Sequence, residues 1–156
     1  MINLFPEWLQ IFILSMIPGI ESRYVVPFAV YKFGWEWWQA FPIAIAGNII
    51  LVPFGLFFLR SIEHYLKQYP SWKKTIDSIF PKIRKRADKK IQRYKNLALL
   101  FFVIVPFPFT GAGLGTLIAY LFDLKFFISI LLIFIGVIIS TTITTFVFLT
   151  GRYLFF

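Results

Sequence analysis

Long uncharged runs alternate with short charged segments along this chain. Three runs have the roughly 20 residues that a helix needs to cross the hydrocarbon core of a bilayer: residues 37–59, 97–122 and 126–151. A fourth run, 8–20, is too short by itself. A soluble globule of this size cannot hide several such runs from water, whereas a bilayer can. The pattern therefore predicts an all-α integral membrane protein.

Helix-breaking residues interrupt the second of these runs at its centre. Two are prolines, which remove helix hydrogen bonds, and three are glycines, which loosen the backbone: Pro106, Pro108, Gly111, Gly113 and Gly115. The arms on either side, 97–105 and 116–122, would each cover half a bilayer at about 1.5 Å per residue. Irregular backbone at membrane depth must be buried in protein or line a wet cavity. We therefore expect a re-entrant helical hairpin whose break faces the interior.

The N-terminal region repeats this pattern. An apolar arm at 4–17 is broken by Pro18 and Gly19, and a second short arm follows at 24–31. Each hairpin precedes one whole span, so the chain order is hairpin, span, basic loop, hairpin, span. If the first hairpin enters from outside, the second enters from the cytoplasm and the two halves are inverted. Inverted repeats with broken helices that meet near the midplane are typical of secondary transporters.

Composition and charge agree with membrane insertion and give an orientation. Hydrophobic residues make up 59% of the chain and charged residues 15%, against roughly 45–50% and 25% in soluble domains. Residues 60–95 contain twelve Lys or Arg and three Asp or Glu, which accounts for the whole net charge of +9. Basic loops of membrane proteins lie in the cytoplasm. We expect a multi-pass protein of the plasma or inner membrane with one membrane domain: hairpin and span at 1–59, a cytoplasmic basic helical loop at 60–96, and hairpin and span at 97–156.

The basic loop carries apolar residues at helical spacing, which predicts amphipathic helices on the cytoplasmic leaflet. These residues are Trp72, Ile76, Ile79, Phe80, Ile83, Ala87 and Ile91. Basic helix faces bind anionic lipid by about 1 kcal/mol per Lys or Arg, so we expect membrane lipid as a partner and no nucleic acid. A cluster of Trp35, Trp37 and Trp38 fits an interfacial belt at the outer face.

Residues that support metal or nucleophilic chemistry are scarce. The chain has no cysteine, and its single histidine, His64, lies beside the basic loop. The sequence contains no His/Glu metal set, Ser/His pair or phosphate-binding loop. We therefore expect no cofactor and no enzymatic activity.

Two charged residues, Glu21 and Arg23, directly follow the first break. Charges inside a membrane cost at least about 2.5–3.5 kcal/mol each and normally serve pairing, substrate binding or proton transfer. Residues two apart do not face each other on a helix, so a direct pair requires a turn, which Pro18 and Gly19 favour. In the functional interpretation Glu21 exchanges a proton and Arg23 binds an anionic group. The alternatives are a structural ion pair that closes the hairpin, or two hydrated charges at the interface.

The second break offers Thr110 and small residues that expose backbone N–H groups, and helix N-termini attract anions. Alternatively, glycines such as Gly111 and Gly115 serve close helix packing. Asn48 lies midway along the first span and either reaches the cavity or, as we expect, hydrogen-bonds another helix. The hydroxyl run at 140–145 is left out of the site because such side chains bond their own helix carbonyls.

Three motifs in fixed order carry a family resemblance. They are a Glu-x-Arg followed four residues later by proline (Glu21, Arg23, Pro27), a Gly-Asn pair (Gly47, Asn48), and a Pro-x-Pro-x-Thr-Gly-Ala-x-x-Gly loop from Pro106 to Gly115. In these motifs the chain resembles the putative small multidrug export protein family, which is similar to the wider DedA/VTT group. The resemblance implies two opposed re-entrant hairpins and either membrane transport or lipid translocation.

These observations favour a proton-coupled exporter of small molecules or drugs. Its site would lie at the midplane, with Glu21 as proton carrier, Arg23 as anion or counter-ion ligand, and residues 110–115 as a backbone gate. A lipid translocase is the first alternative, in which Arg23 and N–H groups of the second hairpin guide a phosphate headgroup. A non-catalytic scaffold is the second. Protons are the candidate coupling ion, and a homodimer remains open at this chain length.

Overall fold

The computed structural model describes residues 5–68, 77–79, 89–107 and 110–155. These residues lie in helices or in the loops between them, and none of them lies in a strand. The helices are α1 (Glu7–Met16), α2 (Glu21–Lys32), α3 (Trp37–Leu66), α5 (Lys89–Ile104), α6 (Ala112–Leu121) and α7 (Phe126–Phe155). The prediction of an all-helical chain is confirmed.

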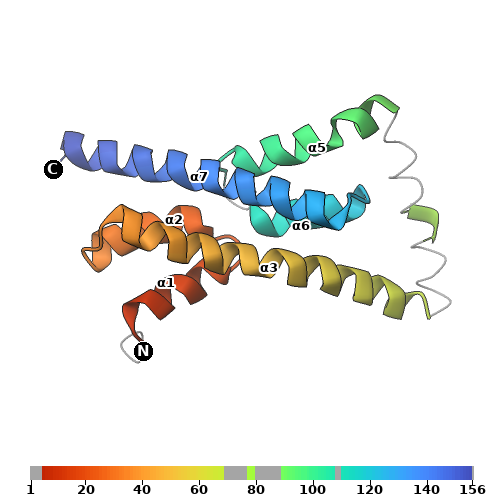
Figure 1. Cartoon of the computed structure of the whole chain (residues 1–156), viewed down its shortest axis with the longest axis horizontal. Coiled ribbons are helices and arrows are strands. Elements are labelled where there is room, and N and C mark those ends of the chain that lie inside the picture. The colour runs from red at the N-terminus through yellow and green to blue at the C-terminus, as the bar shows by residue number, and fades with distance from the viewer. Residues whose placement is uncertain (1–4, 69–76, 80–88, 108–109, 156) are drawn as a thin grey trace.

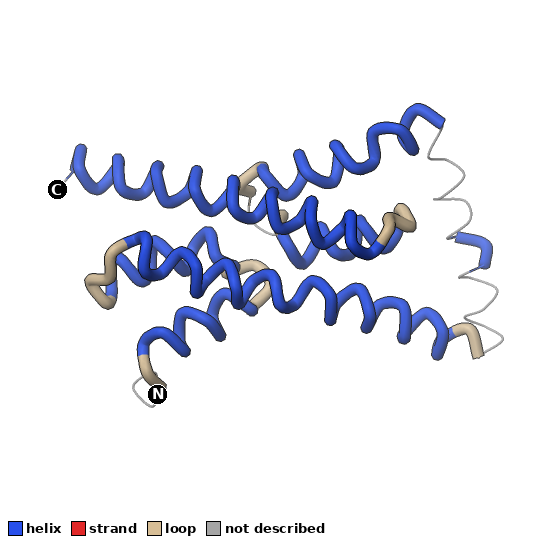
Figure 2. Tube along the Cα trace, in the orientation of Figure 1, coloured by secondary structure: helices blue, strands red, loops and turns tan. Residues whose placement is uncertain are grey.

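Two long helices, α3 and α7, run along the molecule, and two pairs of short helices pack beside them (Figure 1). The α1–α2 pair lies at the end where α3 begins, which we call the tryptophan end. The α5–α6 pair lies at the other end, where α3 runs into the basic segment, which we call the basic end. The two breaks, between α1 and α2 and between α5 and α6, both lie midway along α3 and α7 (Figure 2).

Several predicted helix limits are wrong; besides the start of α2 at Glu21 and the end of α7 at Phe155, three need explanation. The first span was expected to end at residue 59, yet α3 continues to Leu66. Its last turns mix polar and apolar residues, and an ion pair of 2.7 Å between Lys67 Nζ and Glu63 Oε1, four residues apart, supports them. Similarly, α5 begins at Lys89, inside the predicted loop. The apolar run marks the part of a helix that can face lipid, whereas backbone hydrogen bonding sets where the helix ends.

The third correction concerns the second break. Its distal arm was expected to begin at residue 116, but α6 begins at Ala112 and contains both Gly113 and Gly115. Each glycine costs a helix only about 1 kcal/mol, which packing offsets. At Gly115 an added Cβ would come within 2.7 Å of Val103 Cγ2, so the missing side chain allows α6 to approach α5 closely. This geometry favours the packing interpretation for that glycine.

Most of the predicted amphipathic loop helices fall outside the described residues, including those around Trp72, Ile76, Ile83 and Ala87. Of the central basic segment only 77–79 are described, and they form a helical turn. The division of the chain at residues 59/60 and 96/97 stays a prediction.

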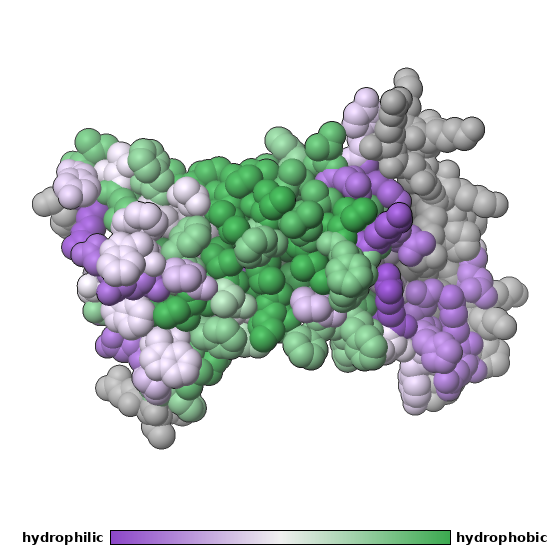
Figure 3. Space-filling view, viewed as in Figure 1, coloured by the Kyte–Doolittle hydropathy of each residue, from purple (hydrophilic) through white to green (hydrophobic). Residues whose placement is uncertain are grey.

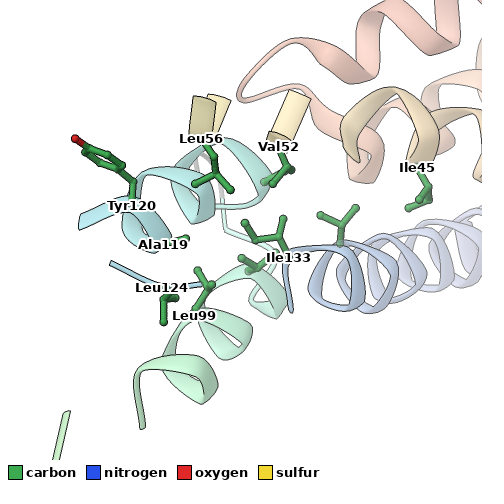
Figure 4. Close-up of a cluster of buried hydrophobic side chains, with 11 residues drawn as sticks. Ile45, Val52, Leu56, Leu99, Ala119, Tyr120, Leu124 and Ile133 are labelled. Carbon is green, nitrogen blue, oxygen red and sulfur yellow. The ribbon is translucent and has the colours of Figure 1, made fainter. Parts of the chain in front are cut away.

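The buried apolar residues form two clusters, one for each helix pair. Around α5 and α6, Leu99, Val103 and Ile133 are fully buried and pack with Val52 and Leu56 of α3 (Figure 4). The other cluster joins α1 and α2 to the first half of α3: Ile11, Val25, Val26, Ala29, Ala40 and Ala44. Each helix pair therefore has its own packing against α3.

The surface has an apolar middle and polar ends. On the face shown in Figure 3, a hydrophobic band crosses the centre and is bounded by polar residues at both the tryptophan end and the basic end. Large apolar side chains are openly exposed within the band, such as Phe54 (66%) on α3 and Phe146 (69%) on α7. Residues Trp37–Tyr65 and Phe126–Leu154 are long and apolar enough to cross a membrane. Such a band is expected of a surface that faces hydrocarbon.

Candidate functional site

The first break is a tight turn that brings two charges together. Gly19 and Glu21 both have positive φ angles, +97° and +48°, so the chain between α1 and α2 is not helical. This turn places Arg23 Nη2 3.0 Å from Glu21 Oε2. Both residues are buried, Glu21 with 4% and Arg23 with 2% exposure. The expectation that the turn would allow a direct pair is confirmed, and the alternative of two hydrated charges does not fit this burial.

Arg23 also reaches across to the second break. Its Nη1 donates to the carbonyl oxygens of Val105 and Phe107, both at 3.3 Å, and lies 3.4 Å from Thr110 Oγ1. Its Nη2 donates to the Thr110 carbonyl oxygen. A helix break leaves carbonyl groups without partners, and a buried carbonyl requires one. One guanidinium therefore supplies donors for the second break while it is paired with the carboxylate of the first.

Gly111 lies where the two breaks touch. Its φ of +145° is a conformation that other residues rarely adopt. A Cβ at this position would overlap Glu21 Oε2 and Arg23 Nη2 and would lie 2.7 Å from Glu21 Cδ. The Glu21 carboxylate also faces the first backbone N–H groups of α6, those of Ala112 and Gly113. A helix N-terminus stabilises a negative charge, so α6 holds the carboxylate from the other side.

Thr110 forms hydrogen bonds within the second break. Its hydroxyl lies 2.8 Å from the Val105 carbonyl oxygen and 2.7 Å from that of Phe107, and it accepts a hydrogen bond from the Phe107 N–H at 3.2 Å. The threonine thus bonds backbone groups on both sides of Pro106, where the helix is interrupted. Together with Arg23, it gives the broken backbone a defined shape.

A chain of buried polar side chains connects three helices beside the ion pair. Asn48 Nδ2 of α3 donates to Ser22 Oγ of α2 at 3.0 Å, and Ser22 Oγ lies 2.8 Å from Thr141 Oγ1 of α7. The predicted interhelical contact of Asn48 is therefore confirmed. Sequence reasoning missed Ser22 and Thr141, although Ser22 stands between the two charged residues. Their neighbour Thr142 bonds the carbonyl of its own helix at 2.8 Å, as expected for this run.

A cavity of about 610 Å³ adjoins the ion pair. The end of α1, the first turn of α2, the second half of α3 and the first turns of α6 form its walls. Most lining side chains are apolar, and the polar ones among the described residues are Glu21, Asn48 and Thr116. Arg23 is not among them, because it lies behind the Glu21 carboxylate. Glu21 thus belongs both to the contact between the breaks and to the cavity wall.

The remaining predicted site residues have more peripheral positions. Pro27 lies half-buried within α2, and Pro106 is exposed in the second break. Pro108 lies outside the described residues. Gly115 contacts Val103 rather than the cavity.

Comparison with known proteins identifies the family of the chain. Neither curated proteins nor solved structures gave a match. A family model described as "Putative small multi-drug export protein" matches residues 21–143, a region that begins at Glu21 and includes Asn48 and both sides of the second break. This region is most of the chain, and the family description agrees with two apolar helices of membrane-spanning length. The chain is a membrane protein that belongs to the small multi-drug export protein family.

Proposed function

We propose that this protein is a proton-coupled exporter of small molecules, whose substrate binds in the cavity beside Glu21. The position of Glu21 carries the proposal. Its carboxylate lines the cavity and also contacts both Arg23 and the start of α6. A proton on this carboxylate therefore affects the substrate site and the contact between the two breaks together.

The distribution of polar residues supports a membrane position. Basic residues gather where α3 ends and α5 begins, and loops of this kind stay in the cytoplasm. The opposite end carries Trp37, Trp38 and Tyr153, which are exposed as in an interfacial belt. In this orientation the α1–α2 and α5–α6 pairs are re-entrant hairpins from opposite sides of a plasma or inner membrane. Their breaks meet at the midplane as inverted halves, the arrangement that the DedA/VTT resemblance implies.

The ion pair provides the coupling. Arginine stays charged at any physiological pH, so Glu21 is the member of the pair that takes up and releases a proton. An ionised Glu21 holds Arg23 and the N-terminus of α6, whereas a protonated one loses most of its attraction for both. Arg23 then keeps its carbonyl partners on the second break. Protonation thus releases the N-terminus of α6 from Glu21 while Arg23 still holds the preceding residues of the second break, and segment 110–115 acts as the gate.

This assignment gives Arg23 the role of counter-ion rather than substrate ligand. Its Nη1 and Nη2 groups already donate to Glu21 and to three backbone carbonyl oxygens. The N–H groups of Ala112 and Gly113 likewise face Glu21. An incoming anion would have to displace the protein's own carboxylate from these donors.

Lipid translocation is a second candidate function, favoured by one observation. Three phenylalanines of the cavity wall, Phe54, Phe57 and Phe58, are 63–72% exposed within the apolar band, so the cavity borders the lipid. The phosphate-binding donors that a lipid headgroup needs are occupied by Glu21, which makes a small-molecule substrate the better fit. Scrambling of a fluorescent phospholipid in vesicles without any ion gradient separates the two functions, because facilitated flipping needs no proton gradient.

The test of the proposal is Glu21→Gln, which keeps the size of the side chain but cannot cycle a proton. Purified protein in vesicles with an imposed pH gradient is assayed for gradient-driven movement of a fluorescent lipophilic dye and for the accompanying proton flux. We expect both to fall to background in Glu21→Gln and to persist in Glu21→Asp. The matched control is Glu7→Gln, a change at an exposed carboxylate that contacts Trp35 at the tryptophan end. Full proton-driven transport by Glu21→Gln would refute the proposal.

A further inference from the structure

The polar end of the cavity offers hydrogen-bond acceptors. Asn48 donates its amide N–H to Ser22, and the Ser22–Thr141 contact fixes that serine in place. The amide oxygen of Asn48 therefore remains as an acceptor for a ligand, beside the second amide N–H. Glu21 contributes carboxylate oxygens to the same wall. Thr116 adds no donor, because its hydroxyl bonds the Ala112 carbonyl oxygen of its own helix at 2.6 Å.

From this arrangement we infer that the cavity binds lipophilic amines through their N–H groups and discriminates against quaternary ammonium ions. The inference rests on the proposed role of the cavity as the substrate site, and it names the substrate class. An ammonium group with N–H bonds can donate to both Glu21 and Asn48. A carboxylate or phosphate ligand would instead meet the Glu21 carboxylate, with no Lys, Arg or His among the described residues that line the cavity.

The discrimination follows from the ion pair. Arg23 lies 3.0 Å from Glu21 and cancels its charge, so the polar end of the cavity has no net charge while Glu21 is ionised. Charge alone therefore attracts a cation weakly, and the ligand must regain through hydrogen bonds the hydration that it loses. An amine does so through its N–H groups. A trimethylammonium group has none, and its methyl groups hold the charge farther from the carboxylate.

The rest of the cavity fits an apolar body of moderate size. Met16, Leu51, Val52 and the phenylalanines at 54, 57 and 58 form its walls. Aromatic faces and a polarisable thioether adapt to aryl groups. The volume of about 610 Å³ is within the range of roughly 300–1,000 Å³ that accommodates drug-sized ligands. Because the wall borders the apolar band, such a ligand would enter from the bilayer.

The test compares three probes that share one body: phenylbutylamine, its N-trimethylated analogue, and the corresponding alcohol phenylbutanol. Binding to the purified full chain in lipid nanodiscs is measured calorimetrically, with no ion gradient. We expect the amine to bind at least about tenfold more tightly than the trimethylated analogue, as one charge-assisted hydrogen bond would give. The alcohol should bind weakly as well. Equal affinity of the amine and its trimethylated analogue for the unaltered protein would overturn the inference without recourse to any variant.

A pair of variants locates the binding. Asn48→Leu should weaken the amine about tenfold and leave the trimethylated analogue unchanged. The matched control is Asn96→Leu, at an asparagine of α5 that does not line the cavity, and it should bind all three probes normally. Unchanged amine binding by Asn48→Leu would contradict the assignment.

The transport assay keeps this inference separate from the proposed function. Selective amine binding without proton-driven movement would confirm the site and refute the exporter. Proton-driven export of other molecules, with no amine selectivity in binding, would refute this inference and leave the exporter intact.

Discussion

The contact between the two helix breaks depends on a missing side chain at Gly111, so Gly111→Ala is the sharpest perturbation of it. The new Cβ would overlap Glu21 Oε2 and Arg23 Nη2. Both atoms end long side chains, yet these side chains are buried and paired, so moving them away breaks the ion pair. Separating a buried ion pair costs about 3–5 kcal/mol. The φ of +145° adds about 1–3 kcal/mol for a residue with a Cβ.

Thermal unfolding of the purified protein in detergent measures this effect. At roughly 2–4 °C per kcal/mol for a chain of this length, Gly111→Ala should lower Tm by on the order of 10 °C and abolish transport. Two controls separate the loss of Tm caused by backbone strain from the loss caused by the clash. Gly34→Ala has a φ of +68° with open space around it, so it reports backbone strain alone. Gly113→Ala meets only Pro18 Cβ, at 3.6 Å, which is an ordinary contact, and its Tm should hardly change.

A partial rescue identifies the carboxylate as the obstacle. In a Glu21→Ala background the clash with Oε2 disappears and Arg23 is free to move, so the added penalty of Gly111→Ala should fall by more than about 1 kcal/mol, as for coupled neighbours. If Gly111→Ala unfolds at the same temperature as Gly34→Ala, or if its penalty is equal in both backgrounds, the two breaks do not touch as described.

Three further predictions follow from the same contacts. Arg23→Gln leaves Glu21 buried without a cation and should lower the free energy of unfolding, measured by chemical denaturation, by about 3–5 kcal/mol. Arg23→Lys keeps the charge but not the forked donors, so its stability should lie between that of Arg23→Gln and that of the unaltered protein. Equal stability of all three proteins would contradict the role of the guanidinium. Thr141→Val should cost about 1 kcal/mol and Ser22→Ala more, because it also removes the bond from Asn48. Because the Ser22–Thr141 bond is shared, the double variant should cost less than their sum. Single cysteines in this naturally cysteine-free chain should react with an impermeant reagent on intact cells at Lys32→Cys and Arg152→Cys but not at Lys125→Cys; labelling of the last would overturn the proposed orientation.

The positions of the helix breaks could be predicted because their causes are local. Pro18 and Gly19 disrupt helical hydrogen bonds whatever surrounds them, and the turn they form made a direct pair of Glu21 and Arg23 one of the alternatives that the sequence left open. Long apolar runs likewise predicted the long helices. Helix ends were predicted less well, as at Leu66 and Ala112, because polar residues continue a helix beyond its apolar run and glycines can lie inside a packed helix.

The contacts across the molecule could not be predicted from one sequence. Arg23 lies more than 80 residues from the carbonyls it contacts, and Ser22 lies 119 residues from Thr141. Nothing in the local sequence of α7 distinguishes Thr141 from its neighbours in the hydroxyl run. The direction that each residue faces depends on how α2 and α7 pack, which is a property of the whole fold.

The most direct test of the account is a disulfide between the two breaks. An ideal Cβ at Gly113 lies 3.6 Å from Pro18 Cβ, within the roughly 3.5–4.5 Å that a disulfide spans. In the cysteine-free chain, a Pro18→Cys/Gly113→Cys protein should crosslink under mild oxidation in membranes, lose proton-driven transport, and regain it on reduction. The control pair Gly34→Cys/Gly113→Cys should stay uncrosslinked, because Gly34 lies at the tryptophan end. Failure of the first pair to crosslink, or full transport by the crosslinked protein, would contradict a transport site formed where the two breaks meet.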